Sequence, residues 1–332
     1  MAEEFDFDVS GAAGGKGTVV RFWNVFKWLV MAAAVWYLWH EGMVSAERLR
    51  PTASAAVGLP AAVVFLGLCT AFVAVRFHCL LRCLDIASEL PKQMRIHFSG
   101  LLAQQIGSEV GYDAMRVLGA RSAGGGIAGI LAAVVADRLL GLLSLTAVAM
   151  VCLAAVWGGK AWLGAALFVP AALAGVGVCL ALAHKAASPE GAWLRRIPGV
   201  GFAVSVCGAL RCYRSRGGLL LSLFFLSVAG HMCFFAALYC CGLSLESAQT
   251  SPAEAVTAGA LSSFTGALPL PMAGLGVGEA AFGEAVARMR GAGEVADFAP
   301  VFLVNRLLLL AMGAVSWLWL SLSGSGRKKE SF

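Results

Sequence analysis

Residues 54–76 read SAAVGLPAAVVFLGLCTAFVAVR, and no charged side chain interrupts this run before Arg76 at its end. An α-helix rises about 1.5 Å per residue, so about 20 apolar residues cross the hydrocarbon core of a bilayer. The run therefore predicts a transmembrane helix. Comparable runs predict further spans at 22–40, 126–157, 161–183, 218–241 and 297–322.

The composition of the whole chain supports this interpretation. The 332 residues are 59% hydrophobic and 13% charged, with a mean hydropathy of +0.80. Soluble globular proteins are about 45–50% apolar and about 25% charged. A transmembrane β-barrel would show short alternating strands in place of long apolar runs. The predicted fold class is therefore all-α, a polytopic integral membrane protein.

The distribution of charge predicts the domain limits and the orientation. Residues 1–20 are expected to form a disordered cytoplasmic tail, without the basic start or cleavage site of a signal peptide, and 323–332 a basic cytoplasmic tail. Between them, 21–322 is the expected transmembrane domain. Lys and Arg gather near both termini and in 185–217, which predicts cytoplasmic termini. These loops account for the net charge of +6, so nucleic acid is not an expected partner. The expected location is a bacterial plasma (inner) membrane.

Two further apolar segments, 93–122 and 254–292, contain helix breakers. Proline lacks an N–H group, and glycine permits backbone shapes that helix interiors avoid. At membrane depth such backbone is tolerated only when it is buried in protein or lines a wet cavity. We therefore expect two re-entrant helical hairpins beside six full spans, or about eight hydrophobic segments. The expected hairpin breakers are Gly111 in QQIGSEVGYDAMR (104–116) and Pro269, Pro271, Gly274, Gly276 and Gly278 in LPLPMAGLGVGEA (268–280).

The spans that come after the two broken segments resemble each other. Each carries an arginine, in VADRLL around Arg138 and in VNRLLL around Arg306. The separations are similar, 25 residues from Asp113 to Arg138 and 27 from Glu279 to Arg306. This pattern predicts an internal repeat of halves 21–157 and 161–322. Three spans per half would turn the second half over, giving an inverted-topology repeat with a site near the midplane.

Charged residues within spans are costly and usually face a partner or a water path. The candidate substrate-binding residues are Asp113, Arg116, Asp137, Arg138, Gly274, Gly276, Glu279, Asn305 and Arg306. A helix restarting at Val277 or Gly278 would add free N–H groups for an anion. The alternative is structural: Asp137 pairs with Arg138, or Arg306 pairs with Glu279, and fixes helix packing. Glu109, Glu284 and Asp297 are expected to be interface acids.

The sequence predicts no cofactor and no metal site. None of the ten cysteines forms a C-x-x-C pair, and no histidines have ligand spacing, so the cysteines are expected to be small buried side chains. His231 lies in the middle of a span, where it is expected to pack or form a hydrogen bond. There is no G-x-x-x-x-G-K-[ST] loop for ATP, which leaves a gradient, a partner or equilibration as the driving force.

At the two broken segments and the arginine-bearing spans that follow them, the chain resembles the flippase-like transmembrane region of the lysylphosphatidylglycerol synthase family. The matches are Gly111, Asp113 and Arg116, then Asp137 and Arg138, then Pro269, Pro271, Gly274, Gly276 and Glu279, then Arg306. The resemblance covers about residues 20–322. Tyr112 stands where the family has the second glycine of a Gly-Gly-Asp motif, and Gln-Gln-Ile-Gly-Ser replaces a leucine-proline run.

The resemblance implies a protein that moves a polar-headed lipid, a phospholipid or a hopanoid or polyprenyl-type lipid, between leaflets. The expected partners are membrane lipids with an anionic or zwitterionic headgroup, and a lipid-synthesis enzyme. The chain stops at Phe332, without the family's soluble aminoacyl-transfer domain, so we expect that it is not an enzyme. Two alternatives are a membrane-embedded enzyme in which Asp113 or Glu279 acts as a base, and a non-catalytic partner subunit.

Overall fold

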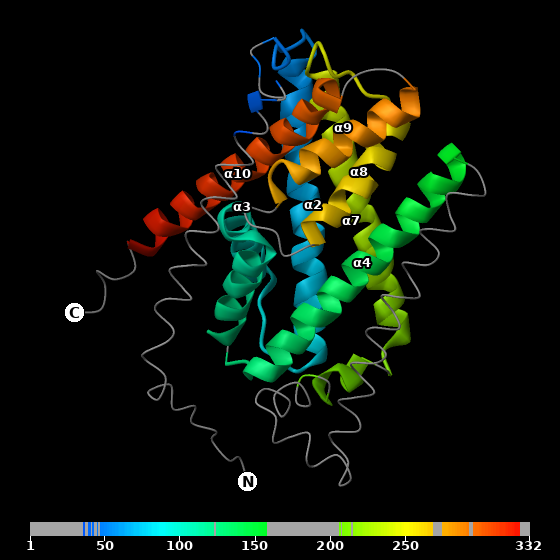
Figure 1. The fold of residues 1–332 in the computed structure, drawn as a ribbon. Helices are drawn as coiled ribbons and strands as arrows, with labels where there is room; N and C mark the ends of the chain where they lie inside the picture. The colour runs from blue at the N-terminus through cyan, green and yellow to red at the C-terminus, as the bar shows by residue number, and fades with distance from the viewer. Residues whose placement is uncertain are drawn as a thin grey trace, which may run out of the picture.

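The computed structural model describes residues 47–122, 124–157, 208–213, 215–267, 274–291 and 295–325, with single positions between 36 and 45 and at 206. The regular elements in this part of the chain are helices (Figure 1). Their bounds are α2 Ala55–Cys83, α3 Leu90–Arg121, α4 Ile127–Trp157, η4 Arg211–Tyr213, α7 Gly217–Leu243, α8 Pro252–Ala267, α9 Val277–Arg290 and α10 Val295–Ser325.

Four of these helices, α2, α4, α7 and α10, are long and apolar enough to cross a membrane. Each corresponds to an apolar run identified in the sequence, so the all-α, polytopic class is confirmed. The predicted span 161–183 lies outside the described residues, and 22–40 does so almost entirely.

Helices α2 and α7 form an antiparallel pair at the centre of the fold. Thr52, just before α2, donates a hydrogen bond to the carbonyl oxygen of Leu243 at the end of α7 (2.8 Å). At the other end, the Tyr213 hydroxyl donates to the carbonyl oxygen of Leu80 (3.0 Å). The prediction that the first of these spans ends at Arg76 is wrong, because α2 continues to Cys83. The helix can continue because the Arg76 side chain is buried and paired with an acid.

The α3 segment folds back on itself. A straight helix would hold residues 92 and 122 about 45 Å apart, yet Lys92 donates a hydrogen bond to the Ser122 hydroxyl (2.9 Å). Nearer the tip, a Cβ atom at Gly111 would lie 2.5 Å from the carbonyl oxygen of Ala103. The segment is therefore a helical hairpin. Gly111 lies within its second arm, after the reversal, and permits close approach of the arms instead of marking the break.

Helices α8 and α9 form a second hairpin. Arg290 at the end of α9 pairs with Glu254 at the start of α8 (2.7 Å) and closes the open end. At the tip, Gly276 has φ 85°, a conformation in the left-handed region that other residues rarely adopt, directly before α9 starts at Val277. The start of this helix agrees with the sequence prediction. Pro269 and Pro271 lie outside the described residues.

The two hairpins open at opposite ends of the α2–α7 pair. The open end of α3 follows the end of α2, where Ile86 packs near Gly125. The open end of α8–α9 lies beside the end of α7, where Arg290 also donates to the carbonyl oxygen of Gln249 (2.6 Å). Both tips therefore point toward the middle of the bundle (Figure 1).

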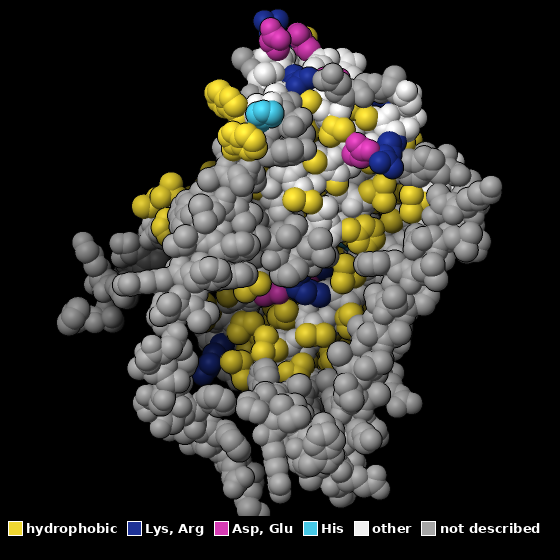
Figure 2. Space-filling model, viewed as in Figure 1, with side chains coloured by type: hydrophobic (Ala, Val, Ile, Leu, Met, Phe, Trp, Pro, Cys, Tyr) yellow, Lys and Arg dark blue, Asp and Glu magenta, His cyan; other side chains and the backbone are white. Residues whose placement is uncertain are grey.

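Two hydrophobic cores lie on either side of the layer in which the two hairpin tips meet. One core contains Leu66, Phe235, Phe282 and the buried part of α10. The other contains Phe77, Leu80, Ile130 and the start of α7. The surface between them is mostly apolar, but Figure 2 shows an acidic and a basic side chain together in the middle of a hydrophobic face. Charged groups therefore occur at the depth where the hairpin tips meet.

Candidate functional site

A cavity of about 370 Å³ occupies the layer between the two cores. Six elements contribute to its walls: α2, α3, α4, α7, α8 and α10. Its polar lining residues are Thr70, Arg76, Gln104, Gln105, Glu109, Tyr112, Arg116, Asp137, Arg138, His231, Ser262, Ser263, Thr265, Asn305 and Arg306. The cavity thus lies at the two hairpin tips and is flanked by apolar helices, as a midplane site requires.

The carboxylate of Asp137 on α4 is a deeply buried group in the wall. One of its oxygens accepts a hydrogen bond from Nε of Arg76 (2.5 Å), and the other pairs with the guanidinium of Arg116 (2.8 Å). Arg76 also donates to the Ser227 hydroxyl on α7 (2.7 Å). All three charged side chains are less than 10% exposed. One buried carboxylate therefore ties together α2, the second arm of α3 and α4, with α7 attached through Ser227.

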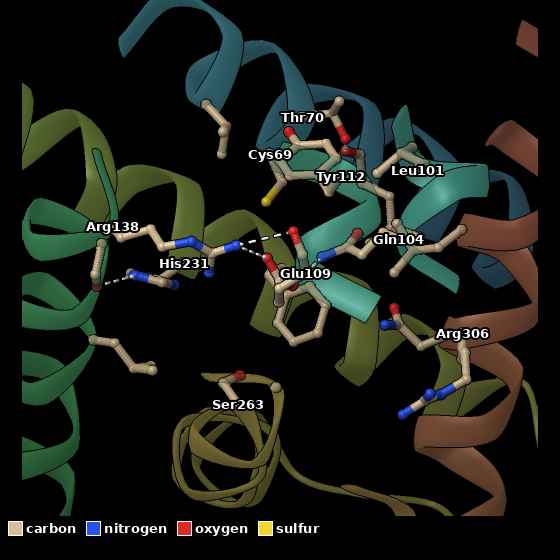
Figure 3. Close-up of a pocket in the computed structure, with 18 of the residues that line it drawn as sticks. Cys69, Thr70, Leu101, Gln104, Glu109, Tyr112, Arg138, His231, Ser263 and Arg306 are labelled. Atoms are coloured by element: carbon tan, nitrogen blue, oxygen red, sulfur yellow. Dashed lines mark hydrogen bonds and ion pairs between the residues drawn. The ribbon is translucent and has the colours of Figure 1, made fainter. Parts of the chain in front are cut away.

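Arg138 forms a second, more exposed network. Its Nε donates to Asp113 (2.7 Å), and its NH2 group donates to the side chain of Glu109 (2.9 Å) and to the Glu109 carbonyl oxygen (3.1 Å). Asp113 also accepts from Arg116 (3.0 Å), so the two networks are joined. The Arg138 side chain is 34% exposed and that of Glu109 is 24% exposed. Figure 3 shows Arg138 reaching across the cavity to Glu109 at the tip of α3.

The sequence also suggested that Asp137 pairs with Arg138 to fix helix packing, and this prediction is wrong. Consecutive helical residues point about 100° apart around the axis. Asp137 faces the buried arginines on α2 and α3, whereas Arg138 faces the tip of α3. Glu109, expected to be an interface acid, instead lines the cavity and binds Arg138.

The opposite wall carries the residues of the second half. Nε of Arg306 on α10 lies 2.8 Å from a carboxylate oxygen of Glu279, whose side chain is fully buried. The other oxygen of Glu279 accepts a hydrogen bond from the backbone N–H of Gly276 (2.7 Å). The expected Arg306–Glu279 pair is therefore present. One backbone donor at the start of α9 is taken by Glu279, which leaves fewer N–H groups for an anion than the sequence suggested.

Gly278 and Asn305 complete this wall. A Cβ atom at Gly278 would lie 2.9 Å from the ring of Phe302 and 3.3 Å from a guanidinium nitrogen of Arg306. This glycine therefore lets α9 approach α10 closely enough for the Glu279–Arg306 contact. Asn305 is 1% exposed and lines the cavity, and no partner for its Oδ1 atom lies within the described residues.

Sequence reasoning missed several residues of the site, among them Arg76 in the cavity wall and its hydrogen-bond partner Ser227. Arg76 stands near the end of an apolar run and was treated as a flanking charge, and Ser227 is one serine among many in an apolar helix. The contacts of α2 with α4 and with α7 reveal their roles. His231 behaves as expected, because its Nε2 lies 3.1 Å from the carbonyl oxygen of Gly141 and its ring stacks on Phe235.

The chemistry of this site is that of arginine–carboxylate pairs. Within the described ranges, no group of three or more His, Cys, Asp and Glu side chains is arranged to hold a metal ion. The described cysteines are free thiols. Guanidinium groups present several N–H donors to phosphate or carboxylate oxygens, and carboxylates accept from ammonium and hydroxyl groups. The cavity can therefore recognise a polar group that carries either type of partner.

Comparison with known proteins places the chain in a family. The family model for the transmembrane region of lysylphosphatidylglycerol synthase matches residues 24–322, which include every helix described above except the last three residues of α10. No curated protein and no solved structure was found to match the chain. The matched range covers most of the sequence, and the chain therefore belongs to the family of the lysylphosphatidylglycerol synthase transmembrane region.

Proposed function

We propose that this protein moves a polar-headed lipid between the two leaflets of its membrane. Membership of the family connects the chain with membrane lipids. The observation that carries the proposal is the cavity at the meeting point of two oppositely directed hairpins, whose walls hold four arginines among apolar helices. A headgroup could occupy this cavity while its acyl chains remain in the lipid phase.

We propose an inverted-topology repeat of six full spans and two re-entrant hairpins, and the arrangement of the described helices supports the repeat. Helices α2 and α7 are antiparallel, and each precedes a hairpin, α3 or α8–α9. Each hairpin is followed by a helix whose arginine binds an acid of that hairpin, Arg138 with Asp113 and Arg306 with Glu279. Halves related in this way can expose a central site to one side and then to the other.

The hairpin tips are the parts best placed to open and close the cavity. The tip of α3 contributes Glu109, whose contact with Arg138 is partly exposed and thus easier to exchange than the buried Asp137 contacts. We propose that an entering headgroup replaces this contact, and that the tips of α3 and α8–α9 separate alternately.

The proposal also assigns each end of the bundle to a side of the membrane. The open end of α3 carries Lys92, Arg95 and Arg121, and by the positive-inside rule it would face the cytoplasm. We place the protein in a bacterial inner membrane with both termini on that side. It would act as a transporter and not as an enzyme, with membrane lipids and a lipid-synthesis enzyme as its partners.

A leaflet-resolved assay tests the proposal. Purified protein is reconstituted into vesicles with a fluorescent lipid, and the labelled lipid accessible to an outside quencher is measured over time. We expect lipid exchange above that of empty vesicles, and its loss in Arg138→Gln. Conservative variants of exposed residues such as Glu284→Gln should keep the activity, because Glu284 is 46% exposed and pairs with Arg288 on the same helix, away from the cavity lining. Absence of exchange for every headgroup tested would refute transport.

A further inference from the structure

The charges balance when the described residues that line the cavity are taken together with the carboxylates that pair with them from behind, Asp113 and Glu279. Four arginines line the cavity, and each is in contact with a carboxylate: Arg76 and Arg116 with Asp137, Arg138 with Glu109 and Asp113, and Arg306 with Glu279. These four arginines and four carboxylates sum to zero. His231 adds no charge when it is neutral. The cavity is therefore polar without an excess of either sign.

A balanced site discriminates against ligands with a net charge. An anionic headgroup that binds an arginine adds a negative charge to a cavity whose arginines are already compensated by carboxylates, in surroundings that are mostly apolar. Uncompensated charge in such surroundings is unfavourable. A headgroup that carries one positive and one negative group can instead satisfy both members of an ion pair and leave the balance unchanged.

One pair is suited to this exchange. Arg138 and Glu109 are the most exposed of the paired cavity residues, at 34% and 24% of their side chains. Asp137 and its two arginines are nearly inaccessible. Arg138 also has Asp113 as a second partner, so it stays oriented when Glu109 turns away. Figure 3 shows the Arg138–Glu109 contact spanning the cavity, where a ligand would meet it.

Uncharged polar groups on the facing walls add acceptors and donors for the same ligand. Gln105 and Asn305 are at most 9% exposed and line the cavity, and no partner for their amide oxygens lies in the described part of the chain. Ser263 on α8 also lines the cavity (Figure 3). Such groups suit an ammonium or a hydroxyl beside a phosphate.

We infer that the cavity selects a zwitterionic phospholipid headgroup with no net charge, in which the phosphate binds Arg138 and the ammonium binds Glu109. This inference rests on the proposed function for its biological meaning, but it concerns binding and can be tested without transport. It sets a headgroup with one phosphate and one ammonium apart from phosphatidylglycerol, which is net negative, and from lysylphosphatidylglycerol, which is net positive.

The test measures binding of three lipids with identical acyl chains to the purified full-length protein by native mass spectrometry. The probes are phosphatidylethanolamine, phosphatidylglycerol and lysylphosphatidylglycerol. We expect phosphatidylethanolamine to bind about tenfold more tightly than either charged lipid, the ratio expected from one half-buried charge contact. Equal binding of all three, or tighter binding of a charged lipid, would overturn the inference. If this order holds while vesicles show no lipid exchange, the transport proposal fails and the headgroup inference stands.

Two charge variants of the cavity give a second test, because the inference predicts opposite changes in their lipid preference. Glu109→Gln gives the described walls a net charge of +1 and should shift preference toward phosphatidylglycerol. Arg138→Gln gives −1 and should shift preference toward lysylphosphatidylglycerol. The matched control Glu284→Gln also removes one carboxylate, but it lies outside the cavity and should preserve the wild-type order. A similar change of preference in the control, or no change in either cavity variant with retained folding, would contradict the inference.

Discussion

Replacement of Asp137 by asparagine tests whether the buried carboxylate holds the first half together. Asp137 is 3% exposed and contacts Arg76 and Arg116 at 2.5 and 2.8 Å. The substitution keeps the size of the side chain but leaves two guanidinium groups on either side of a neutral amide. Two like charges about 5 Å apart, in surroundings with an effective dielectric constant of about 20, repel by about 3 kcal/mol.

Measured losses for one member of a buried ion pair are similar, about 3–5 kcal/mol. Because the whole free energy of unfolding is about 5–15 kcal/mol for a typical domain, a large part of the stability would be lost. We expect the melting temperature of Asp137→Asn in detergent to fall by about 10 °C. The measurement is size-exclusion chromatography after heating at a series of temperatures.

Two comparisons make the result interpretable. Glu284→Gln breaks an exposed pair between residues four apart and should change the melting temperature little. Adding Arg76→Gln to Asp137→Asn removes one of the two unpaired charges and should recover part of the loss, as coupled residues do in a double-mutant cycle. A melting temperature of Asp137→Asn within about 1 °C of wild type would refute the reasoning, because the carboxylate would then not compensate the arginines.

Three further variants test other parts of the fold. Gly111→Val places a side chain against a carbonyl oxygen of the facing arm and should destabilise the α3 hairpin by about 1–3 kcal/mol in thermal melts, whereas Gly218→Ala, with open space around it, should not. Glu279→Gln should remove both the ion pair to α10 and transport in vesicles, and normal transport in this variant would separate the pair from function. Arg290 lowers the pKa of Glu254 from 4.5 to about 2 by hydrogen bonding, so this pair stabilises the fold above about pH 4.5 and the contribution is lost as the pH falls toward 2. At pH 6, the free energy of unfolding of Arg290→Gln should therefore be lower than that of wild type by less than about 1 kcal/mol, and the difference should be smaller at pH 3. Thermal melts at both pH values measure it, and a difference that stays constant across this range would argue against the pair.

Much of the architecture could be predicted from local patterns in the sequence. Long apolar runs identified four spans because a span is a property of consecutive residues. The acid and arginine associated with each hairpin identified both walls of the cavity, since charged residues are rare in apolar segments and are easy to recognise there. The start of α9 was predicted because the glycines before Val277 interrupt a helix.

The partners of those charges could not be predicted in the same way. Asp137 binds arginines 61 and 21 positions earlier in the chain, and no local pattern distinguishes these from the adjacent Arg138. Arg76 was mistaken for a flanking residue because a paired arginine and an interfacial one look alike in a single sequence. The reversal of α3 was placed too late because Gly111 attracted attention, whereas the contacts place the turn between Ala103 and Gly111.

The two separate hydrophobic cores have a mechanical consequence. Helices α2, α4 and α7 pass through both cores and act as a frame, while α3 packs with one core and α8 and α9 with the other. The open end of each hairpin is held next to one core, and its other end reaches the polar cavity between the cores. A change in the polar contacts of the cavity would therefore reach both hairpins while their open ends keep their place in the cores.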